Sequence, residues 1–157
     1  MNRRTLHRVG LIAAIAAAAP LLVGGLAQGT PGDRVTSAVT ARGTSEDKIK
    51  SRGNQPFDVV VQSITIQPGG HSGWHSHPGQ AIVVIKSGTF TTYDASDKTC
   101  SRHVYDAGEV YVDDGHGHVH IARNEGSVPL EVQVTYIDVP VGAAFRTDAP
   151  RPGNCPF

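Results

Sequence analysis

Short β-prone runs separated by turn residues fill the middle of the chain, and this pattern constrains the fold more than any other feature. Each run is rich in β-branched or aromatic residues and ends near Gly, Pro, Asp or Ser; the first is expected to stop at residues 68–70, Pro-Gly-Gly. No window shows the 3.6-residue hydrophobic period of an amphipathic helix. The pattern predicts an all-β sandwich or barrel. The expected strands are residues 57–66, 81–85, 89–93, 102–105, 109–112, 118–122 and 130–139.

Charge and composition narrow the class of protein further. The chain of 157 residues carries 14 basic and 14 acidic side chains, so its formal net charge is zero. A nucleic-acid-binding domain usually has a basic excess, so we expect no nucleic-acid partner. Hydrophobic residues make up 39% of the chain, which is too many for a disordered protein. The length suits one domain with tails.

The N-terminal residues have the order of an export signal. Arg3, Arg4 and Arg8 precede residues 9–27, which carry no charge and are rich in Ala and Leu. A basic segment followed by an apolar one is typical of a secretory signal peptide, and the small residues at its end favour cleavage after Ala27. We therefore expect a secreted or extracytoplasmic protein with no stable membrane association after signal cleavage.

Two alternatives stay open for this segment. One is an uncleaved membrane anchor, because residues 9–27 are almost long enough to span a bilayer, although Pro20 and the small side chains weaken such a span. The other concerns the export route. Residues 2–6, Asn-Arg-Arg-Thr-Leu, resemble a twin-arginine signal in which Asn2 replaces the usual Ser or Thr.

The chain has two cysteines, Cys100 and Cys155. In an exported protein an even number of cysteines favours a disulfide. This bridge would attach the C-terminal segment to a hairpin loop. The segment is rich in Pro and Gly and is expected to run over the surface. Two free thiols are the alternative. A cysteine metal site is disfavoured because neither residue has a second cysteine at C-x-x-C spacing.

Histidines are concentrated in two short segments. His75 and His77 form one His-x-His pair, and His118 and His120 form another, preceded by His116. Alternate residues of a β-strand face the same side, so each pair can point into one cavity. Two such pairs on facing strands would converge on a metal ion, for which neutral imidazole is a common ligand. The spacing therefore predicts metal binding.

The segments that contain these histidines resemble the two sequence motifs of the cupin superfamily. Residues 69–88 read GGHSGWHSHPGQAIVVIKSG, and residues 108–124 read GEVYVDDGHGHVHIARN. The resemblance extends over residues 57–139 and implies a single-domain cupin-type double-stranded β-helix, also called a jelly-roll barrel. The matching positions are Gly69, His75, His77 and Gly88 in the first motif and, with one residue inserted, Gly108, Gly117, His120 and Asn124 in the second.

The resemblance also implies a set of metal ligands. Ala81 stands where the family has a glutamate ligand, so water, Gln80 or the substrate would complete the set. His118 shares a strand face with His120 and is either a spare ligand or a hydrogen-bond donor behind the ligands. Trp74 is either an aromatic wall of the substrate pocket or a core residue. The implied ligands of a divalent transition metal ion (Fe, Mn, Ni, Cu or Zn) are His75, His77 and His120.

Two functions remain for such a site. The first is a metal-dependent, dioxygenase-like oxidoreductase that acts on a small molecule, and the alternative is a non-catalytic cupin that binds a metal or a small molecule. Retention of the three histidines disfavours a third interpretation, a degenerate scaffold. Asp113 and Asp114 are expected to cap a loop rather than to form a paired acid–base site.

The expected organisation follows from these features. Cupins often pair through their sheets, so a homodimer stays open. The expected parts are a signal peptide (1–27), a flexible N-terminal segment with one edge strand near residues 34–41 (28–55), a cupin domain (56–140) and a C-terminal tail pinned by the disulfide (141–157).

Overall fold

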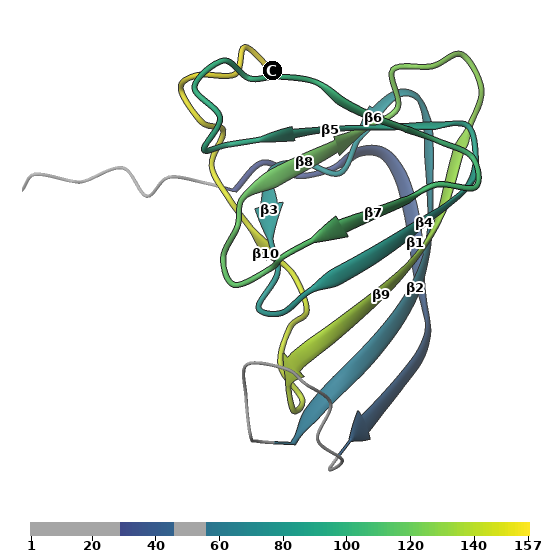
Figure 1. Cartoon of the computed structure of the whole chain (residues 1–157), viewed down its shortest axis with the longest axis vertical. Helices are drawn as coiled ribbons and strands as arrows, with labels where there is room; N and C mark the ends of the chain where they lie inside the picture. The colour runs from purple at the N-terminus through teal and green to yellow at the C-terminus, as the bar shows by residue number, and fades with distance from the viewer. Residues whose placement is uncertain (1–28, 46–55) are drawn as a thin grey trace, which may run out of the picture.

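The computed structural model describes residues 29–45 and 56–157 (Figure 1). In these ranges the chain is all β and forms a nearly closed antiparallel barrel, which confirms the expected fold class. No helix in the described ranges has the length and apolarity needed to cross a bilayer. The predicted signal peptide, residues 1–27, lies outside the described residues. The strands are β1 (Asp33–Ser45), β2 (Phe57–His71), β3 (His75–Ser76), β4 (Ala81–Ser87), β5 (Thr89–Asp94), β6 (His103–Asp106), β7 (Val110–Asp113), β8 (His120–Arg123), β9 (Leu130–Pro140) and β10 (Thr147–Asp148).

Strand order explains how the two histidine segments meet. One path through the sheet runs β10-β3-β8-β2-β9-β4-β7, while β1 pairs with β2, and β5 pairs with both β6 and β8. The strands β3 and β8 are therefore neighbours, and His75 lies directly opposite His120 in their antiparallel register. The topology brings together residues that are far apart in the sequence.

The predicted end of the first strand at residues 68–70 is wrong, because β2 continues to His71. Gly69 adopts a φ of +78°, a backbone conformation that glycine takes without steric cost. The Gly69 N–H donates to the Asn124 carbonyl at 2.9 Å, and the Asn124 N–H donates to the Gly70 carbonyl at 3.0 Å. These bonds keep the end of β2 attached to the end of β8, just before the segment that carries His75.

The edge strand expected near residues 34–41 lies within β1, which is longer and almost entirely exposed. Backbone pairing with β2 and a polar clamp hold it in place. The buried Asp58 carboxylate accepts hydrogen bonds from Thr44 Oγ1 (2.7 Å) and the Gly142 N–H (3.0 Å), and it forms an ion pair with Arg42 (2.5 Å). The hydrogen bond from Thr44, then that from Gly142, and then Arg42 lower the pKa of Asp58 to about 2.

Apolar side chains fill the barrel in two clusters. The period-2 alternation of β4 directs Ala81, Val83 and Ile85 inward, where they meet alternate residues of β2, β8 and β9. Burying a Val or Ile side chain in this way contributes about 1.5–3 kcal/mol. A second cluster forms around Trp74 and includes Cys155 from the C-terminal segment. The first cluster encloses a cavity that leads to the histidines.

Candidate metal centre

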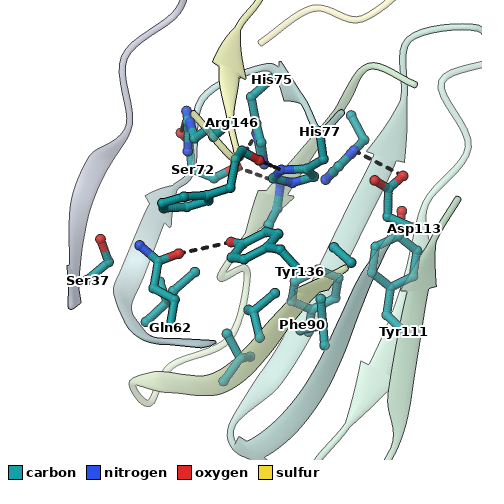
Figure 2. A pocket seen from close by; sticks show the side chains of 18 of the residues that line it. Ser37, Gln62, Ser72, His75, His77, Phe90, Tyr111, Asp113, Tyr136 and Arg146 are labelled. Atoms are coloured by element: carbon teal, nitrogen blue, oxygen red, sulfur yellow. Dashed lines mark hydrogen bonds and ion pairs between the residues drawn. The ribbon is translucent and has the colours of Figure 1, made fainter. Parts of the chain in front are cut away.

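Three imidazole rings converge at one end of the barrel interior (Figure 2). His75 lies on β3, His77 follows it, and His120 begins β8. Their ring centroids are 4.8 Å (His75–His77), 4.5 Å (His75–His120) and 5.4 Å (His77–His120) apart. The residues are only 4–5% exposed. Alternation places His75 and His77 on one face, and the register of β3 against β8 adds His120.

Backbone carbonyls determine which nitrogen of two of these rings carries the proton. His75 Nδ1 lies 2.8 Å from the Gly73 carbonyl, and His77 Nδ1 lies 2.7 Å from the Phe145 carbonyl. A carbonyl can only accept, so each Nδ1 must donate, and the lone pair of a neutral ring is then on Nε2. Burial lowers the pKa of His75 far below its usual range and also lowers the pKa of His77. Both rings are therefore neutral at physiological pH.

The third ring has a different environment. Burial is the main cause that lowers the pKa of His120, to about 4, so this ring is also neutral. Its Nδ1 is buried and has no hydrogen-bond partner among the described residues. The nearest carboxylate oxygen, Asp113 Oδ1, lies 3.6 Å away, so Nε2 is the nitrogen turned away from that carboxylate.

These features fit a divalent transition metal ion. The three histidines offer ligand atoms within 4.8 Å of one another, and neutral imidazole suits Zn, Cu, Fe and Ni. His120 Nδ1 is also a buried nitrogen without a partner among the described residues, and an unsatisfied buried polar atom is costly. The structure thus brings together the three histidines that the cupin resemblance implies as ligands, and binding itself stays a prediction.

The position of the family's glutamate is apolar in this chain. Ala81 is 1% exposed and lines the cavity beside the histidines, but it has no ligand atom. Gln80, the predicted alternative, is exposed and does not line the cavity. The structure therefore does not bring Gln80 to the histidines.

His118, the other candidate ligand, uses both ring nitrogens elsewhere. Nδ1 lies 2.6 Å from Asp113 Oδ1, and Nε2 lies 2.9 Å from Asp94 Oδ2. Carboxylates accept, so both nitrogens must donate and the ring is an imidazolium. Burial lowers the pKa of His118, but the hydrogen bonds and charges of Asp94 and Asp113 outweigh that effect and raise it overall. His118 stacks on His120 with ring centroids 5.6 Å apart, so it supports a ligand rather than acting as one.

A cavity of about 160 Å³ adjoins the three histidines. Figure 2 shows Arg146 and Ser72 at the histidine end, and Tyr136 reaching across to Gln62. The Tyr136 hydroxyl donates to Gln62 Oε1 at 2.9 Å, and both side chains are buried. The remaining walls are mainly apolar, and they include Ile64, Ile66, Val83, Phe90, Ala122, Val132 and Val134.

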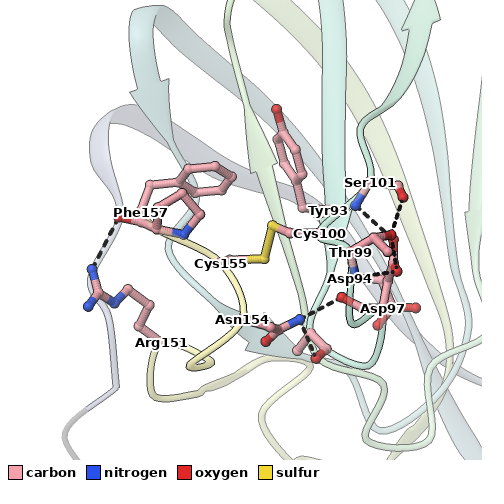
Figure 3. The surroundings of a disulfide bond; sticks show 12 residues. Tyr93, Asp94, Asp97, Thr99, Cys100, Ser101, Arg151, Asn154, Cys155 and Phe157 are labelled. Atoms are coloured by element: carbon pink, nitrogen blue, oxygen red, sulfur yellow. Dashed lines mark hydrogen bonds between the residues drawn. A yellow bond between two sulfur atoms is a disulfide. The ribbon is translucent and has the colours of Figure 1, made fainter.

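The C-terminal segment is built into the site, although the sequence predicts that it runs over the surface. Residues Thr147–Asp148 form β10, which pairs with β3, and Arg146 Nη2 donates to the Ser72 carbonyl at 2.7 Å. The predicted disulfide between Cys100 and Cys155 is present, with a Cα–Cα distance of 5.5 Å (Figure 3). The tail therefore supplies part of the cavity wall and the carbonyl that orients His77.

The predicted role of Trp74 in the pocket is not supported by the structure. Trp74 is 1% exposed, packs in the second cluster and donates from Nε1 to the Phe157 carbonyl at 3.1 Å. Trp74 is thus a core residue, the alternative that the sequence left open.

Three cavity residues are not identified by sequence reasoning. Asp113 is 1% exposed and supports His118, whereas the sequence suggests a loop cap. Its alternation with Tyr111 on β7 is a signal that could have placed it inside. Alternation of Val132 and Val134 could likewise have placed Tyr136, the next inward residue of β9. No local pattern marks Arg146.

Comparison with known proteins agrees with this architecture. The cupin domain family matches residues 62–139. A search of curated protein sequences gives no significant match. Among solved structures, a polyketide cyclase from Streptomyces resistomycificus is similar with a TM-score of 0.51 and 11% identity, over 69% of this chain and 68% of the cyclase.

Two further solved structures have slightly lower TM-scores. An uncharacterized conserved protein with a double-stranded β-helix domain from Klebsiella pneumoniae is 23% identical over 59% of this chain and 71% of that protein, with a TM-score of 0.49. Oxalate decarboxylase from Bacillus subtilis is 24% identical over 57% of this chain, with a TM-score of 0.49. The match spans about a quarter of the decarboxylase, 24% of its length.

Proposed function

The chain belongs to the cupin superfamily, and on that premise we propose that it is a metal-dependent oxidoreductase that acts on a small molecule. His75, His77 and His120 would hold one divalent transition metal ion. The observation that carries the proposal is the convergence of three buried, neutral imidazoles at the end of a mainly apolar cavity. A bound Fe, Mn, Ni or Cu ion would supply Lewis acidity and one-electron chemistry at that point.

The protein's own side chains support binding more than proton transfer. Asp113 is held by the His118 ring and by the Gly115 N–H, so it is not free to act as a general base toward a ligand. The three neutral histidines add no charge, so a bound ion would keep its positive charge at these ligands and would favour an anionic ligand. Tyr136 and Arg146 are placed to orient a molecule in the cavity.

Asp113 is the only carboxylate among the described residues that line the cavity, and because it is already held, one alternative is favoured, a non-catalytic cupin that binds a metal and a small molecule. The two functions predict the same metal ligands. They differ only in whether the loaded protein consumes oxygen or transforms a bound compound.

Metal content is the first test. Protein purified without an affinity tag should contain about one equivalent of Fe, Mn, Ni or Cu by elemental analysis. His77→Ala should lose the metal, whereas His103→Ala, which removes an exposed histidine of β6, should retain it. An intact fold without metal in the unmodified protein would contradict the proposal. Metal without oxygen uptake in a screen of phenols and diketones would favour the non-catalytic alternative.

We also propose that the protein is exported. Support comes from the order of basic and apolar residues before Gln28 and from the disulfide, which is typical of an oxidising compartment. N-terminal sequencing of the protein should begin near Gln28, whereas an intact Met1 would favour a membrane anchor.

A further inference from the structure

The ring of His120 borders two cavities. One is the cavity inside the barrel, described above. The other, which we call the side cavity, has a volume of about 440 Å³ and is lined by residues of β5 and β6 on one side and of β7 on the other (Figure 1). Asp113 also lines both cavities. The side cavity is open to solvent at Asp94 and His118, which are both partly exposed.

The two ring nitrogens of His120 have different surroundings. Nε2 is turned away from Asp113, whereas Nδ1 lies 3.6 Å from Asp113 Oδ1, which is too long for a hydrogen bond. Nδ1 is therefore a buried polar atom that has no hydrogen-bond partner among the described residues. Native proteins rarely leave such an atom without a polar group, a water molecule or an ion. Something is expected to bind His120 on this side.

Two further ligand atoms meet this nitrogen. The Gly115 N–H donates to Asp113 Oδ2 at 3.2 Å, which leaves Oδ1 directed at the rings of His118 and His120. Ligand atoms of Asp113, His118 and His120 all lie within 4.8 Å of one another. Asp94 Oδ2 holds His118 from the other side, 2.9 Å from Nε2. A carboxylate on the second nitrogen is how proteins commonly orient a histidine that binds a metal through its first nitrogen.

The distances suit a small tetrahedral cation. Metal–ligand bonds of 2.0–2.1 Å place neighbouring ligand atoms roughly 3.3 Å apart. The 3.6 Å between His120 Nδ1 and Asp113 Oδ1 is already close to that spacing. The 2.6 Å between His118 Nδ1 and Asp113 Oδ1 is shorter by roughly 0.7 Å. His118 is partly exposed, so its ring has room to make this small movement.

Charge favours a divalent ion at the same point. In the ion-free protein one imidazolium, His118, faces two carboxylates, Asp94 and Asp113. An ion that replaces the Nδ1 proton of His118 would leave that ring neutral, and the two carboxylates would then match the two positive charges of the ion. Two imidazole nitrogens and one carboxylate oxygen are a donor set that Zn²⁺ takes, with water as the fourth ligand.

We infer that Asp113, His118 and Nδ1 of His120 form a second divalent-cation site, which opens to the side cavity and suits Zn²⁺. His118 supports the three-histidine centre from behind, and toward the side cavity it is itself a ligand. The second site needs neither His75 nor His77, so it does not depend on the proposed function. If both sites are filled, the His120 ring bridges the two ions as an imidazolate, and the Nδ1 protons of His118 and His120 pass to solvent.

Calorimetric titration of the metal-free protein with Zn²⁺ tests the second site. The unmodified protein should bind two equivalents. His118→Gln removes one ligand, while its amide can still donate to the buried Asp113, and it should bind one equivalent. His77→Ala should also bind one equivalent, at the second site. His103→Ala is the matched control, because His103 lines the side cavity outside the cluster, and it should bind two.

A second variant keeps the test valid if His118→Gln does not fold. Asp94→Asn retains an oxygen that accepts from His118 Nε2 but removes one negative charge at a partly exposed position. Loss of such a supporting carboxylate commonly weakens metal binding at least about tenfold. The second equivalent of Zn²⁺ should therefore bind at least about tenfold more weakly, and the first should be unaffected. Equal affinity for the second equivalent would contradict the inference.

The outcomes separate the second site from the proposed function. One equivalent in both the unmodified protein and His118→Gln would overturn the second site and leave Asp113 as a support for the two rings. Two equivalents in His118→Gln would place the second ion elsewhere and would also overturn it. One equivalent that is lost in His118→Gln and kept in His77→Ala would support the second site and overturn the proposed function. No uptake by any of these proteins would overturn both.

Discussion

Removal of the Cys100–Cys155 bridge is expected to affect both stability and the metal centre. The two cysteines are 55 residues apart in sequence. Closing a loop of that length lowers the entropy of the unfolded chain by an amount worth about 4 kcal/mol at 25 °C. The double variant Cys100→Ser/Cys155→Ser should therefore lose about 4 kcal/mol of unfolding free energy, a large part of the 5–15 kcal/mol typical of a domain.

The same variant should weaken metal binding. The bridge holds the segment that contributes the Phe145 carbonyl to His77 and the pairing partner of β3. Greater freedom of this segment lowers the population in which His77 is oriented by its carbonyl. We expect a higher dissociation constant for Zn²⁺, measured by competition with a chelator, in the variant than in the unmodified protein.

Urea unfolding followed by tryptophan fluorescence gives the stability change. The probe is suitable because the single Trp, Trp74, is buried against the tail. Lys98→Ser, an exposed change in the loop that carries Cys100, is the matched control and should leave the midpoint unchanged. A loss below about 1 kcal/mol in the cysteine variant would refute the loop-entropy argument. Unchanged Zn²⁺ affinity would refute the coupling between the tail and His77.

Three further predictions concern single side chains. Tyr136→Phe leaves the buried Gln62 Oε1 without its donor, so unfolding free energy should fall by about 1–3 kcal/mol in urea titrations; Gln62→Leu added to it should recover part of the loss, and an additive loss would contradict this account. The pKa of Asp58 is about 2 in the folded protein against an ordinary value of 3.8, so its stabilising effect is present above pH 4 and is lost as pH falls toward 2. Asp58→Asn should therefore flatten the dependence of the melting temperature on pH in that window, and an unchanged slope would show that other carboxylates dominate. Ala81→Glu places a carboxylate beside three neutral rings, so it should tighten Zn²⁺ binding at least about tenfold in chelator competition; equal affinity would show that this side chain cannot reach the ion.

Strand positions and the convergence of His75, His77 and His120 could be predicted because they depend on local patterns. The His-x-His spacing at residues 75–77 survives any error in strand boundaries, since two alternate residues share a face whatever the strand length. Most strand ends could also be predicted, because the turn residues that mark them are a local feature of the sequence. The Pro-Gly-Gly sequence misled the prediction because β2 is held there by backbone bonds from residue 124, a partner that local sequence does not reveal.

The residues that surround the three histidines were harder to predict, because their positions depend on contacts between distant segments. Asp113 resembles a loop residue until its alternation with Tyr111 is considered. Its partner His118 also contacts Asp94, which comes from another strand. Arg146 reaches the cavity only because β10 pairs with β3. Trp74 likewise depends on a distant segment, because its packing against the C-terminal residues places it in the core.

The position of Phe145 in the sequence determines the stage of synthesis at which the histidine site becomes complete. Synthesis proceeds from the N-terminus, so all three histidines emerge before the residue that orients His77. A nascent chain that ends before residue 145 has every candidate ligand but lacks both that acceptor and the strand that pairs with β3. For the proposed metal ion, full affinity is therefore expected only of the finished chain.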